Sequence, residues 1–511
     1  MRSSALRVLV VPALVLAVLS ALTAAPTPAD AAPGHHRPAH AGAAPELTLQ
    51  LRDLFVARTE FGIFDRMVAS AILARPTDGS QDPQGDGYPH GSTELCGSRI
   101  CVHYVRSGAD APPSTGWVRH VLHTMGSVWN HEVDDLGFRR PPSDGKRGGD
   151  GRFDVYLTDL GARGLYGYCA PETRVKGQPM TASGYCVLDN DFSKQQYGAP
   201  RQVSLEVTAA HEFFHAIQFG YDFRADPWLM ESTAVWMEES YADSADDNRR
   251  YLPYGDVHRP GVPLDSYSTT GLAQYGNWAF WEYLTQRYGD GLIRQVWNHV
   301  DARKGAPADS SVAALSRVLN LRTGTRSGLA DTLASYAVAN LDPATSYPEG
   351  KAWPRATYAG RARMRHARGQ RTLTVHVDHL AAQNLLFRPP TSGDSRLLQL
   401  TVHGPRRRAR AIVTVRRVDG TTAVRRVVLA GTGVSTVNFT PGRVASVVLT
   451  LVNGSARYTC DRGTLLSCGG TPRDDDMAFT VDAAVVPPPP HPKHAVNKRR
   501  AGHGDSPQAS P

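Results

Sequence analysis

Two histidines and a glutamate within five positions are the residues of this 511-residue chain best suited to do chemistry. His211 and His215 are four residues apart, so on a helix both imidazoles lie on one face and can reach a single metal ion. Glu212 follows the first histidine and is placed to take a proton from a water on that metal. Residues 204–219 contain no Gly or Pro, which suits a helix. The spacing therefore favours a zinc site with its own general base over a helix with two structural histidines.

A hydrolytic zinc site needs a third protein ligand and one open position for water. In one common pattern, a Gly three residues and a His six residues after the second histidine complete the site. Those positions hold Gln218 and Tyr221 here, so this pattern is excluded. Asp222 lies next to the required position, but without the Gly turn it is a weak candidate.

Glu231 is the stronger candidate for the third ligand. Asp226 is a suitable N-cap and Pro227 suits the first helical position, so a helix is expected to begin there. Glu231 then lies one turn inside, on an otherwise apolar face where a carboxylate is costly to bury unless it binds a cation. Glu238 shares this face but lies about two turns, or ~10 Å, further along. We expect Glu231 on the metal, and Glu238 either beside the site or in solvent.

The motif at 211–215, together with Glu231 and Trp236 downstream, resembles the gluzincin branch of secreted bacterial zinc metallopeptidases over about residues 200–290. The resemblance implies a zincin-like α+β domain, zinc on two His and one Glu, and peptide hydrolysis with the motif's Glu as base and proton shuttle. Thermolysin-like members carry an Asp four residues after the ligand Glu to orient a zinc-bound His. Here that position is Val235, so the orienting partner must come from elsewhere.

Peptide hydrolysis also needs a hydrogen-bond donor for the oxyanion that forms on the scissile carbonyl. Gluzincins commonly supply a Tyr or His from a later helix, and a helix is expected to begin at Tyr275. Tyr275 is therefore the candidate, although a structural tyrosine at a helix start fits the sequence equally well. A sheet edge before the motif commonly pairs with extended substrate, and we assign this role to the expected strand at 153–159 or to one near Gly184.

Residues 1–31 have the three parts of a secretory signal peptide. Arg2 and Arg7 give the positive start, residues 8–22 the apolar run and residues 29–31 a small-residue cleavage site. The apolar run is short for a membrane-spanning helix, and no later stretch reaches a spanning length. We expect an exported, extracellular protein without a membrane span; an uncleaved anchor is the alternative.

The cysteines and the net charge agree with export. Six cysteines fall into three local pairs, which suits disulfide bonds in an oxidising compartment, and no pair has the C-x-x-C spacing of a second zinc site. A formal charge of +8 can indicate nucleic-acid binding, but no aromatic residues alternate with the basic runs, so nucleic acid is not an expected partner. The expected pairs are Cys96–Cys101, Cys169–Cys186 and Cys460–Cys468.

Composition divides the mature chain into five segments. Residues 32–45 are expected to be a disordered lead-in, and residues 46–92 are either a removable propeptide or the first part of the catalytic domain. Residues 93–369 are assigned to the zincin-like catalytic domain. Short alternating β-branched runs separated by turns then predict a β-sandwich over residues 370–486. The Pro-rich basic segment 487–511 is expected to be disordered.

Two further binding sites are weighed against simpler interpretations. The loop 144–154 is rich in Asp and Gly like a calcium turn, but it lacks the EF-hand spacing and its bidentate Glu, so a plain turn is favoured over Ca²⁺ binding. The sandwich carries basic runs at 406–408 and 425–426 and contains no Glu. These runs suit adhesion to an acidic wall or surface polymer, but arginines on solvated strand faces are the favoured interpretation.

The sequence therefore predicts a secreted zinc metallopeptidase that acts on a protein or peptide substrate. An endopeptidase is favoured over an aminopeptidase, because no clear acidic motif for a free N-terminus is present. The alternative is a non-catalytic secreted surface or adhesion protein with a degenerate zincin fold that binds through its sandwich. Glu212 argues for the enzyme, because a structural zinc site needs no base at that position. The oligomeric state does not follow from the sequence.

Overall fold

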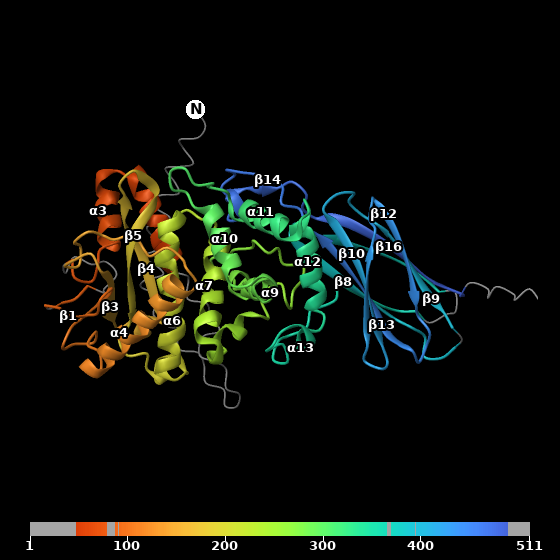
Figure 1. The fold of residues 1–511 in the computed structure, drawn as a ribbon, viewed down its shortest axis with the longest axis horizontal. Coiled ribbons are helices and arrows are strands. Elements are labelled where there is room, and N and C mark those ends of the chain that lie inside the picture. The colour runs from red at the N-terminus through yellow and green to blue at the C-terminus, as the bar shows by residue number, and fades with distance from the viewer. Residues whose placement is uncertain (1–46, 79–86, 90, 365–368, 394, 489–511) are drawn as a thin grey trace, which may run out of the picture.

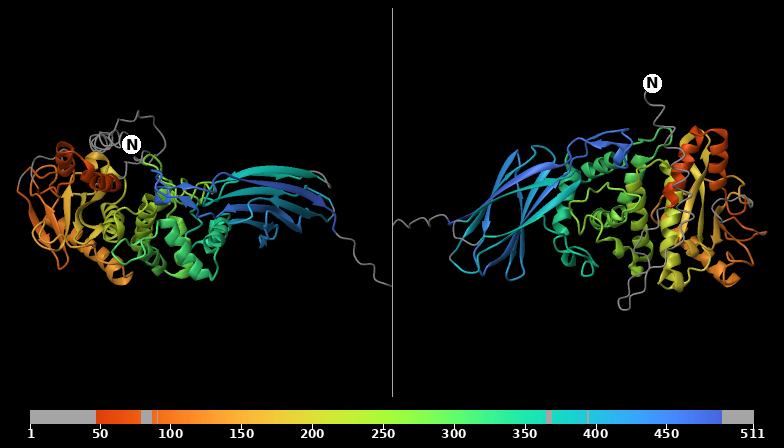
Figure 2. Two further views of the ribbon diagram at one scale, coloured as in Figure 1. Left: turned by 90° about the horizontal axis from the view of Figure 1, so that it is seen from above. Right: turned by 180° about the vertical axis from the view of Figure 1, so that it is seen from behind.

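The protein is described from a computed structural model that mixes helices and sheets, in agreement with the predicted α+β class. A sheet-containing block, a central helical block and a sandwich of strands follow one another along the long axis (Figure 1). Two further views agree with this order (Figure 2). The predicted signal peptide, the lead-in and most of the tail lie outside the described residues. The structure describes residues 47–78, 87–89, 91–364, 369–393 and 395–488.

A five-stranded sheet of order β1-β2-β3-β5-β4 supports the motif helix. β2, β3 and β5 are parallel, whereas β1 and β4 are antiparallel edge strands. Both strands proposed to pair with substrate are interior, since 153–159 falls on β3 and Gly184 on β5, so that prediction is wrong and the edge strand beside the motif is β4. The strands are β1 (Thr93–Cys96), β2 (Ile100–Tyr104), β3 (Phe153–Thr158), β4 (Gly167–Val175) and β5 (Gln178–Asp189).

The N-terminal segment is built into this block through the side chain of Arg75. Its guanidinium binds Asp144, Asp154 at 2.6 Å and Glu172 at 2.5 Å, and its side chain is 1% exposed. Loss of the segment would remove this cation from three buried carboxylates, so the described residues 47–78 are part of this packed block. Asp144 and Asp154, the first and last residues of the loop considered for Ca²⁺, are two of these three carboxylates. The guanidinium of Arg75, and not a metal ion, lies between them. The segment contains α2 (Leu47–Ala57), a 3-10 turn η1 (Arg58–Glu60) and α3 (Ile63–Ile72).

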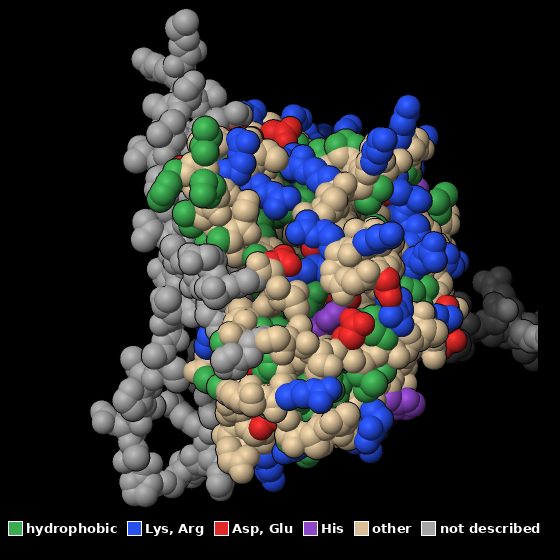
Figure 3. All heavy atoms as spheres, turned by 90° about the vertical axis from the view of Figure 1, so that its left-hand side faces the viewer, with side chains coloured by type: hydrophobic (Ala, Val, Ile, Leu, Met, Phe, Trp, Pro, Cys, Tyr) green, Lys and Arg blue, Asp and Glu red, His purple; other side chains and the backbone are tan. Residues whose placement is uncertain are grey.

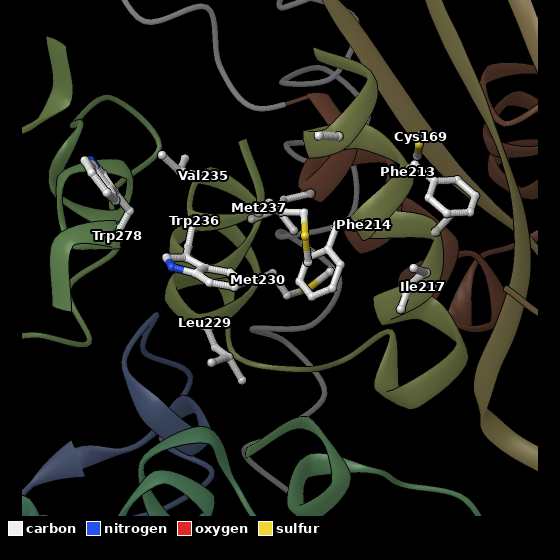
Figure 4. Close-up of a cluster of buried hydrophobic side chains, with 14 of the residues drawn as sticks. Cys169, Phe213, Phe214, Ile217, Leu229, Met230, Val235, Trp236, Met237 and Trp278 are labelled. Carbon is white, nitrogen blue, oxygen red and sulfur yellow. The ribbon is translucent and has the colours of Figure 1, made fainter. Parts of the chain in front are cut away.

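The motif lies on α6 (Arg201–Asp222), a helix that is buried on nearly every side. Phe213 and Ile217 point towards the sheet, whereas Phe214 points towards Met230 and Met237 of the next helix (Figure 4). A helix that is apolar all round belongs in the interior, and only its polar positions then need partners of their own. The other helices before α7 are α4 (Thr115–Trp129), the π-helical turn η2 (Asn130–Asp135), η3 (Gly161–Arg163) and α5 (Lys194–Tyr197).

Helix α7 (Pro227–Ala242) begins at the predicted proline, but Asp226 does not cap it. The Asp226 carboxylate instead accepts hydrogen bonds from the backbone N–H groups of Cys468 at 2.8 Å and Ser311 at 3.1 Å. It therefore joins the start of α7 to two segments far along the chain. The remaining helical elements are η4 (Asp243–Ala245), η5 (Asp247–Tyr251), α8 (Ala273–Gly276), α9 (Trp278–Tyr288), α10 (Gly291–Val300), α11 (Ser311–Thr323), α12 (Gly328–Ala339), α13 (Pro343–Ser346) and η6 (Ser467–Gly469).

The C-terminal part is a β-sandwich whose two sheets share one apolar core. Its strands cover the predicted range 370–486, and β6 precedes that range. One sheet has the order β11-β10-β13-β8-β6 and the other β12-β9-β16-β7, with a small β14-β15 pair beside them. The strands are β6 (Gly360–Arg363), β7 (Gln370–Val377), β8 (Ala381–Arg388), β9 (Leu397–His403), β10 (Ala409–Arg417), β11 (Thr422–Val427), β12 (Thr432–Asn438), β13 (Val444–Asn453), β14 (Tyr458–Thr459), β15 (Thr471–Pro472) and β16 (Met477–Val486).

Three covalent cross-links and one ionic contact complete the architecture. The three predicted local disulfides are confirmed. Arg426, from one of the basic runs of the sandwich, pairs with Asp331 of α12 at 2.8 Å, so at least this arginine has a structural partner. In the part of the chain that the structure describes, no helix combines the length and apolarity needed to cross a membrane.

The Arg75 cluster gives a stability prediction. Arg75→Met should lower the free energy of unfolding by about 3–5 kcal/mol, because removing one partner of a buried ion pair leaves the other charges uncompensated. Urea denaturation measures the change. Arg355, which pairs with Asp342 at 2.8 Å on the surface, is the matched control. Arg355→Met should cost at most about 1 kcal/mol. Equal losses in the two variants would show that the segment is not anchored through Arg75.

Candidate metal centre

The structure brings His211, His215 and Glu231 together between α6 and α7. One ligand atom from each lies within 4.8 Å of the others. Glu231 Oε2 is 3.5 Å from His211 Nε2, and Glu231 Oε1 is 3.8 Å from His215 Nε2. These separations are longer than a well-formed hydrogen bond, and they suit atoms that surround a common ion at ~2 Å each. The proline that begins α7 thus starts a helix that delivers its carboxylate to the motif histidines.

The hydrogen bonds of His215 fix its tautomer. Its Nδ1 lies 2.8 Å from Oε1 of Gln218, and the Gln218 Nε2 group donates to the carbonyl of Met230 at 3.0 Å. Because that carbonyl only accepts, the amide orientation is set, and Gln218 Oε1 must accept a proton from Nδ1. His215 Nε2 therefore carries a lone pair, and it has no hydrogen-bond partner among the described residues. A buried, unprotonated imidazole nitrogen directed at a carboxylate fits a metal ligand.

Glu238 orients the other motif histidine, His211. His211 Nδ1 lies 2.6 Å from Glu238 Oε1, which places a proton on Nδ1 and directs Nε2 towards Glu231. A carboxylate behind a metal-binding imidazole fixes the ring and raises its basicity. Val235 cannot orient a histidine, and Glu238, one turn later on the same helix, does so for His211. Gln218 is the orienting partner of His215. The expectation that Glu238 lies beside the site, rather than on the ion, agrees with this geometry.

Burial and neighbouring charges move the pKa values of the two histidines in opposite directions. Burial lowers the pKa of His215 well below its usual value. Burial also acts to lower the pKa of His211, but its contacts with Glu231 and Glu238 outweigh that effect and raise it well above its usual value. Without metal, the cluster therefore holds its positive charge as a proton on His211. A divalent cation can take over that role between the same carboxylates.

Glu212 lies at the side of the cluster that reaches solvent. His211 and Glu212 are 8% and 5% exposed, whereas His215 and Glu231 are fully buried. Thr48 Oγ1 of α2 donates to Glu212 Oε2 at 3.0 Å and accepts from the backbone N–H of Cys169 on β4 at 2.9 Å. The N-terminal segment therefore orients the carboxylate that the sequence assigns as general base.

Close packing also brings strand β4 against the base. A Cβ on Gly167 would lie 3.1 Å from Glu212 Cγ and 2.9 Å from Thr208 Cγ2. Only a glycine lets the beginning of β4 approach α6 this closely. The edge strand and the carboxylate of Glu212 are consequently held next to each other.

Two other residues were considered from the sequence, Tyr275 and Asp222. The ring of Tyr275 stacks on that of Tyr251, with the centroids 5.1 Å apart. Asp222 accepts a hydrogen bond from the backbone of Arg224 at 2.8 Å, and burial raises its pKa to about 6. Tyr275 as oxyanion donor stays a prediction, and Asp222 is not in the ligand group.

Arg250 is a charged neighbour of the site that the sequence did not reveal. It lies on the short turn η5 and binds the Tyr251 hydroxyl at 2.7 Å and Asp247 at 3.0 Å. Burial raises the pKa of Glu238, and the positive charge of Arg250 is one of the influences that oppose this rise. No spacing relative to the motif marks such a residue, because η5 reaches the site only through tertiary folding.

The role of Glu238 can be tested by its effect on zinc affinity. Glu238→Ala should weaken zinc binding by about 10- to 100-fold, because His211 loses the acceptor that orients it. Competition with a chromophoric chelator measures the affinity. Glu239, the next residue, binds Asn248 Nδ2 at 2.6 Å and provides the control. Glu239→Ala should leave zinc affinity nearly unchanged; an equal loss in both variants would remove Glu238 from the site.

Zinc affinity should also depend on pH in a defined direction. Since the pKa of His211 is raised in the metal-free protein, a proton must leave before Nε2 can bind a cation. Affinity should therefore fall as pH drops below that pKa, by about tenfold per pH unit for one proton, and level off above it. Titration calorimetry in buffers of different ionisation enthalpy measures the released proton. An affinity independent of pH below neutrality would contradict this competition.

Comparisons with known proteins found a weak structural likeness and no match in sequence families. No family model matches it, and no curated protein matches it. A similar solved structure is a family GH115 4-O-methyl-alpha-glucuronidase with specificity for decorated arabinogalactans, at 10% identity and a TM-score of 0.14. The match covers 69% of this chain and 54% of that one, so it spans about half the length of the neighbour.

This neighbour bears on the predicted enzyme class. It is a glycoside hydrolase, which is a different class of hydrolase from the predicted zinc metallopeptidase or endopeptidase. The comparison contradicts that classification, and the assignment of the chain to the metallopeptidases as an enzyme class is withdrawn. The neighbour's own substrate and activity are not carried over to this chain, because the likeness has 10% identity and a TM-score of 0.14.

Proposed function

We propose that this chain is an exported zinc-dependent hydrolase that cleaves a carbonyl-centred bond, with Glu212 as general base. The observation that carries the proposal is the convergence of His211, His215 and Glu231, with each imidazole Nδ1 already bonded to its own acceptor. Both imidazoles thereby present Nε2 to one point, next to a carboxylate. Amides and esters are the substrates to test, because both contain the carbonyl-centred bond that such a site can cleave.

The chemistry follows from the position of each side chain. When bound, zinc supplies a Lewis acid and acidifies a water molecule. Glu212 would take a proton from the attacking water and pass it to the leaving group, as a carboxylate general base does. Thr48, through its 3.0 Å hydrogen bond, keeps the Glu212 carboxylate in one orientation. Glu238 and Gln218 accept protons from Nδ1 of the two imidazoles, so both Nε2 atoms can bind the metal once the second proton of His211 has left.

Strand β4 limits how an extended substrate can bind. An edge strand offers its outward N–H and C=O groups to an extended peptide. At Cys169, however, the N–H already donates to Thr48. A peptide substrate must therefore pair with β4 at other residues or compete with α2 at this one. The same contact serves to orient Glu212, so the two roles of Thr48 are linked.

The rival proposal is a secreted surface protein without catalytic activity that uses the site only structurally and binds through its sandwich. Three confirmed disulfides suit export under either proposal. The two differ in Glu212, which has no task in a structural zinc site. Its side chain nonetheless lies at the edge of the cluster that reaches solvent.

Glu212→Gln separates the two proposals. Hydrolysis of casein, a fluorogenic peptide library or an activated ester by the zinc-loaded chain should fall by about 10²- to 10⁴-fold, because the general base is lost. The zinc stoichiometry, measured by elemental analysis, should stay the same. Glu206, which binds Gln202 at 2.5 Å on the same helix, gives the control Glu206→Gln with retained activity.

A zinc-loaded wild type that is inert on every peptide and ester would favour the surface protein. Glycoside substrates extend the same assay. Cleavage of a glycoside that survives Glu212→Gln would place the activity on other residues and overturn the proposed mechanism.

A further inference from the structure

A second candidate site lies on the same block, around the end of strand β4 and the turn after α2. A cavity of about 440 Å³ opens there, and a neighbouring one of about 430 Å³ shares part of its wall. Arginines and hydroxyl side chains make up much of the lining. From the geometry of these groups we propose that this cavity binds a phosphate group. The lining residues used below are Arg58, Ser70, Arg147 and Arg174.

The positive charge in the cavity exceeds the negative charge that faces it. Arg58 and Arg174 form no ion pair with a carboxylate among the described residues. Glu172 lines the cavity, but Arg75 binds both of its oxygens and Arg147 also binds it, at 3.0 Å. Asp78 lies 3.8 Å from Arg147 and balances one charge at most. A net positive charge therefore remains for a ligand.

Two of the arginines are held in place by aromatic rings rather than by acids. The guanidinium carbon of Arg58 lies 4.2 Å from the centroid of the Phe55 ring, and that of Arg174 lies 5.6 Å from the same ring. Arg174 also lies 5.4 Å from the ring of Phe223. Cation–π contacts fix a guanidinium without using its N–H donors. Arg58 also donates to the carbonyl of Glu172 at 3.1 Å, and its other donors and those of Arg174 are available to an anion in a preformed arrangement.

The positive charges of Arg58, Arg147 and Arg174 repel one another, as expected for groups that lie close together. Burial lowers the pKa of Arg58, and the charges of Arg174 and Arg147 lower it further. An anion placed among these groups would relieve the repulsion. Guanidinium groups match phosphate oxygens in geometry, and the hydroxyl of Ser70 is an additional donor. A phosphate dianion suits this set better than a single carboxylate, because several guanidiniums share it.

The phosphate has two sources with the same chemistry: free phosphate and the headgroup of a phospholipid. Beside the cavity, α3 exposes the large apolar side chains of Ile63, Phe64 and Met67, at 83%, 77% and 66%. Figure 3 shows the side of the molecule that lies at the left in Figure 1. In its upper half, basic side chains gather next to exposed hydrophobic ones. Apolar side chains beside arginines are typical of surfaces that meet anionic lipid.

Calorimetric titration of the full chain with inorganic phosphate, at low ionic strength, tests the site. Arg174→Gln should weaken phosphate binding by about tenfold or more, because it removes a charge-assisted hydrogen bond. Arg58→Gln should do the same and guards against a variant that fails to fold. Arg322, an exposed arginine on α11, is the control, and Arg322→Gln should leave binding unchanged.

Vesicles separate the two sources of phosphate. A lipid headgroup is identified if the chain sediments with phosphatidylglycerol vesicles but not with phosphatidylcholine vesicles. This sedimentation should be lost in Arg174→Gln and in Phe64→Ser. Phosphate binding that survives Phe64→Ser, without vesicle binding, would identify free phosphate. The proposal is overturned if neither phosphate nor anionic vesicles bind, or if Arg322→Gln weakens binding as much as Arg174→Gln.

Discussion

Compensation of the polar groups buried between α6 and α7 is the constraint on which the rest of this structure depends. His215 and Glu231 are fully buried, so bulk solvent does not reach them. A buried charge or imidazole is tolerated only when it has a partner of suitable charge and direction. Gln218 and Glu238 take the two Nδ1 atoms, which leaves both Nε2 atoms facing Glu231. The cluster thereby presents three ligand atoms to one point, where a metal cation would balance the charge of Glu231.

The same constraint explains why distant parts of the chain converge on this helix pair. Thr48, far before the motif, orients Glu212, and Asp226 ties the start of α7 to Ser311 and to the loop at Cys468. Such tethers hold α6 and α7 in fixed register, and a metal site needs that precision. The Arg75 cluster secures the N-terminal segment in turn, so that Thr48 is delivered reliably to the base.

The sequence predicted features that depend on residues close together in the chain. It did not predict contacts between residues that only the tertiary fold brings together. The four-residue spacing of His211 and His215, and a carboxylate on the apolar face of a proline-started helix, are properties of single helices. The short disulfides and most sandwich strands are local in the same sense. The order of strands in the first sheet is not, and β4 was overlooked as the edge strand. Asp226 and Tyr275 show the same limit, since their contacts come from residues that no spacing connects with them.

X-ray absorption at the zinc edge of the zinc-loaded chain tests the central claim most directly. The arrangement of His211, His215 and Glu231 predicts two imidazole nitrogens at ~2.0–2.1 Å and carboxylate or water oxygen at ~2.0–2.2 Å. Imidazole scattering should be halved when either histidine is replaced. A shell containing sulfur, or one of oxygens alone, would contradict the claim that this helix pair is a metal centre.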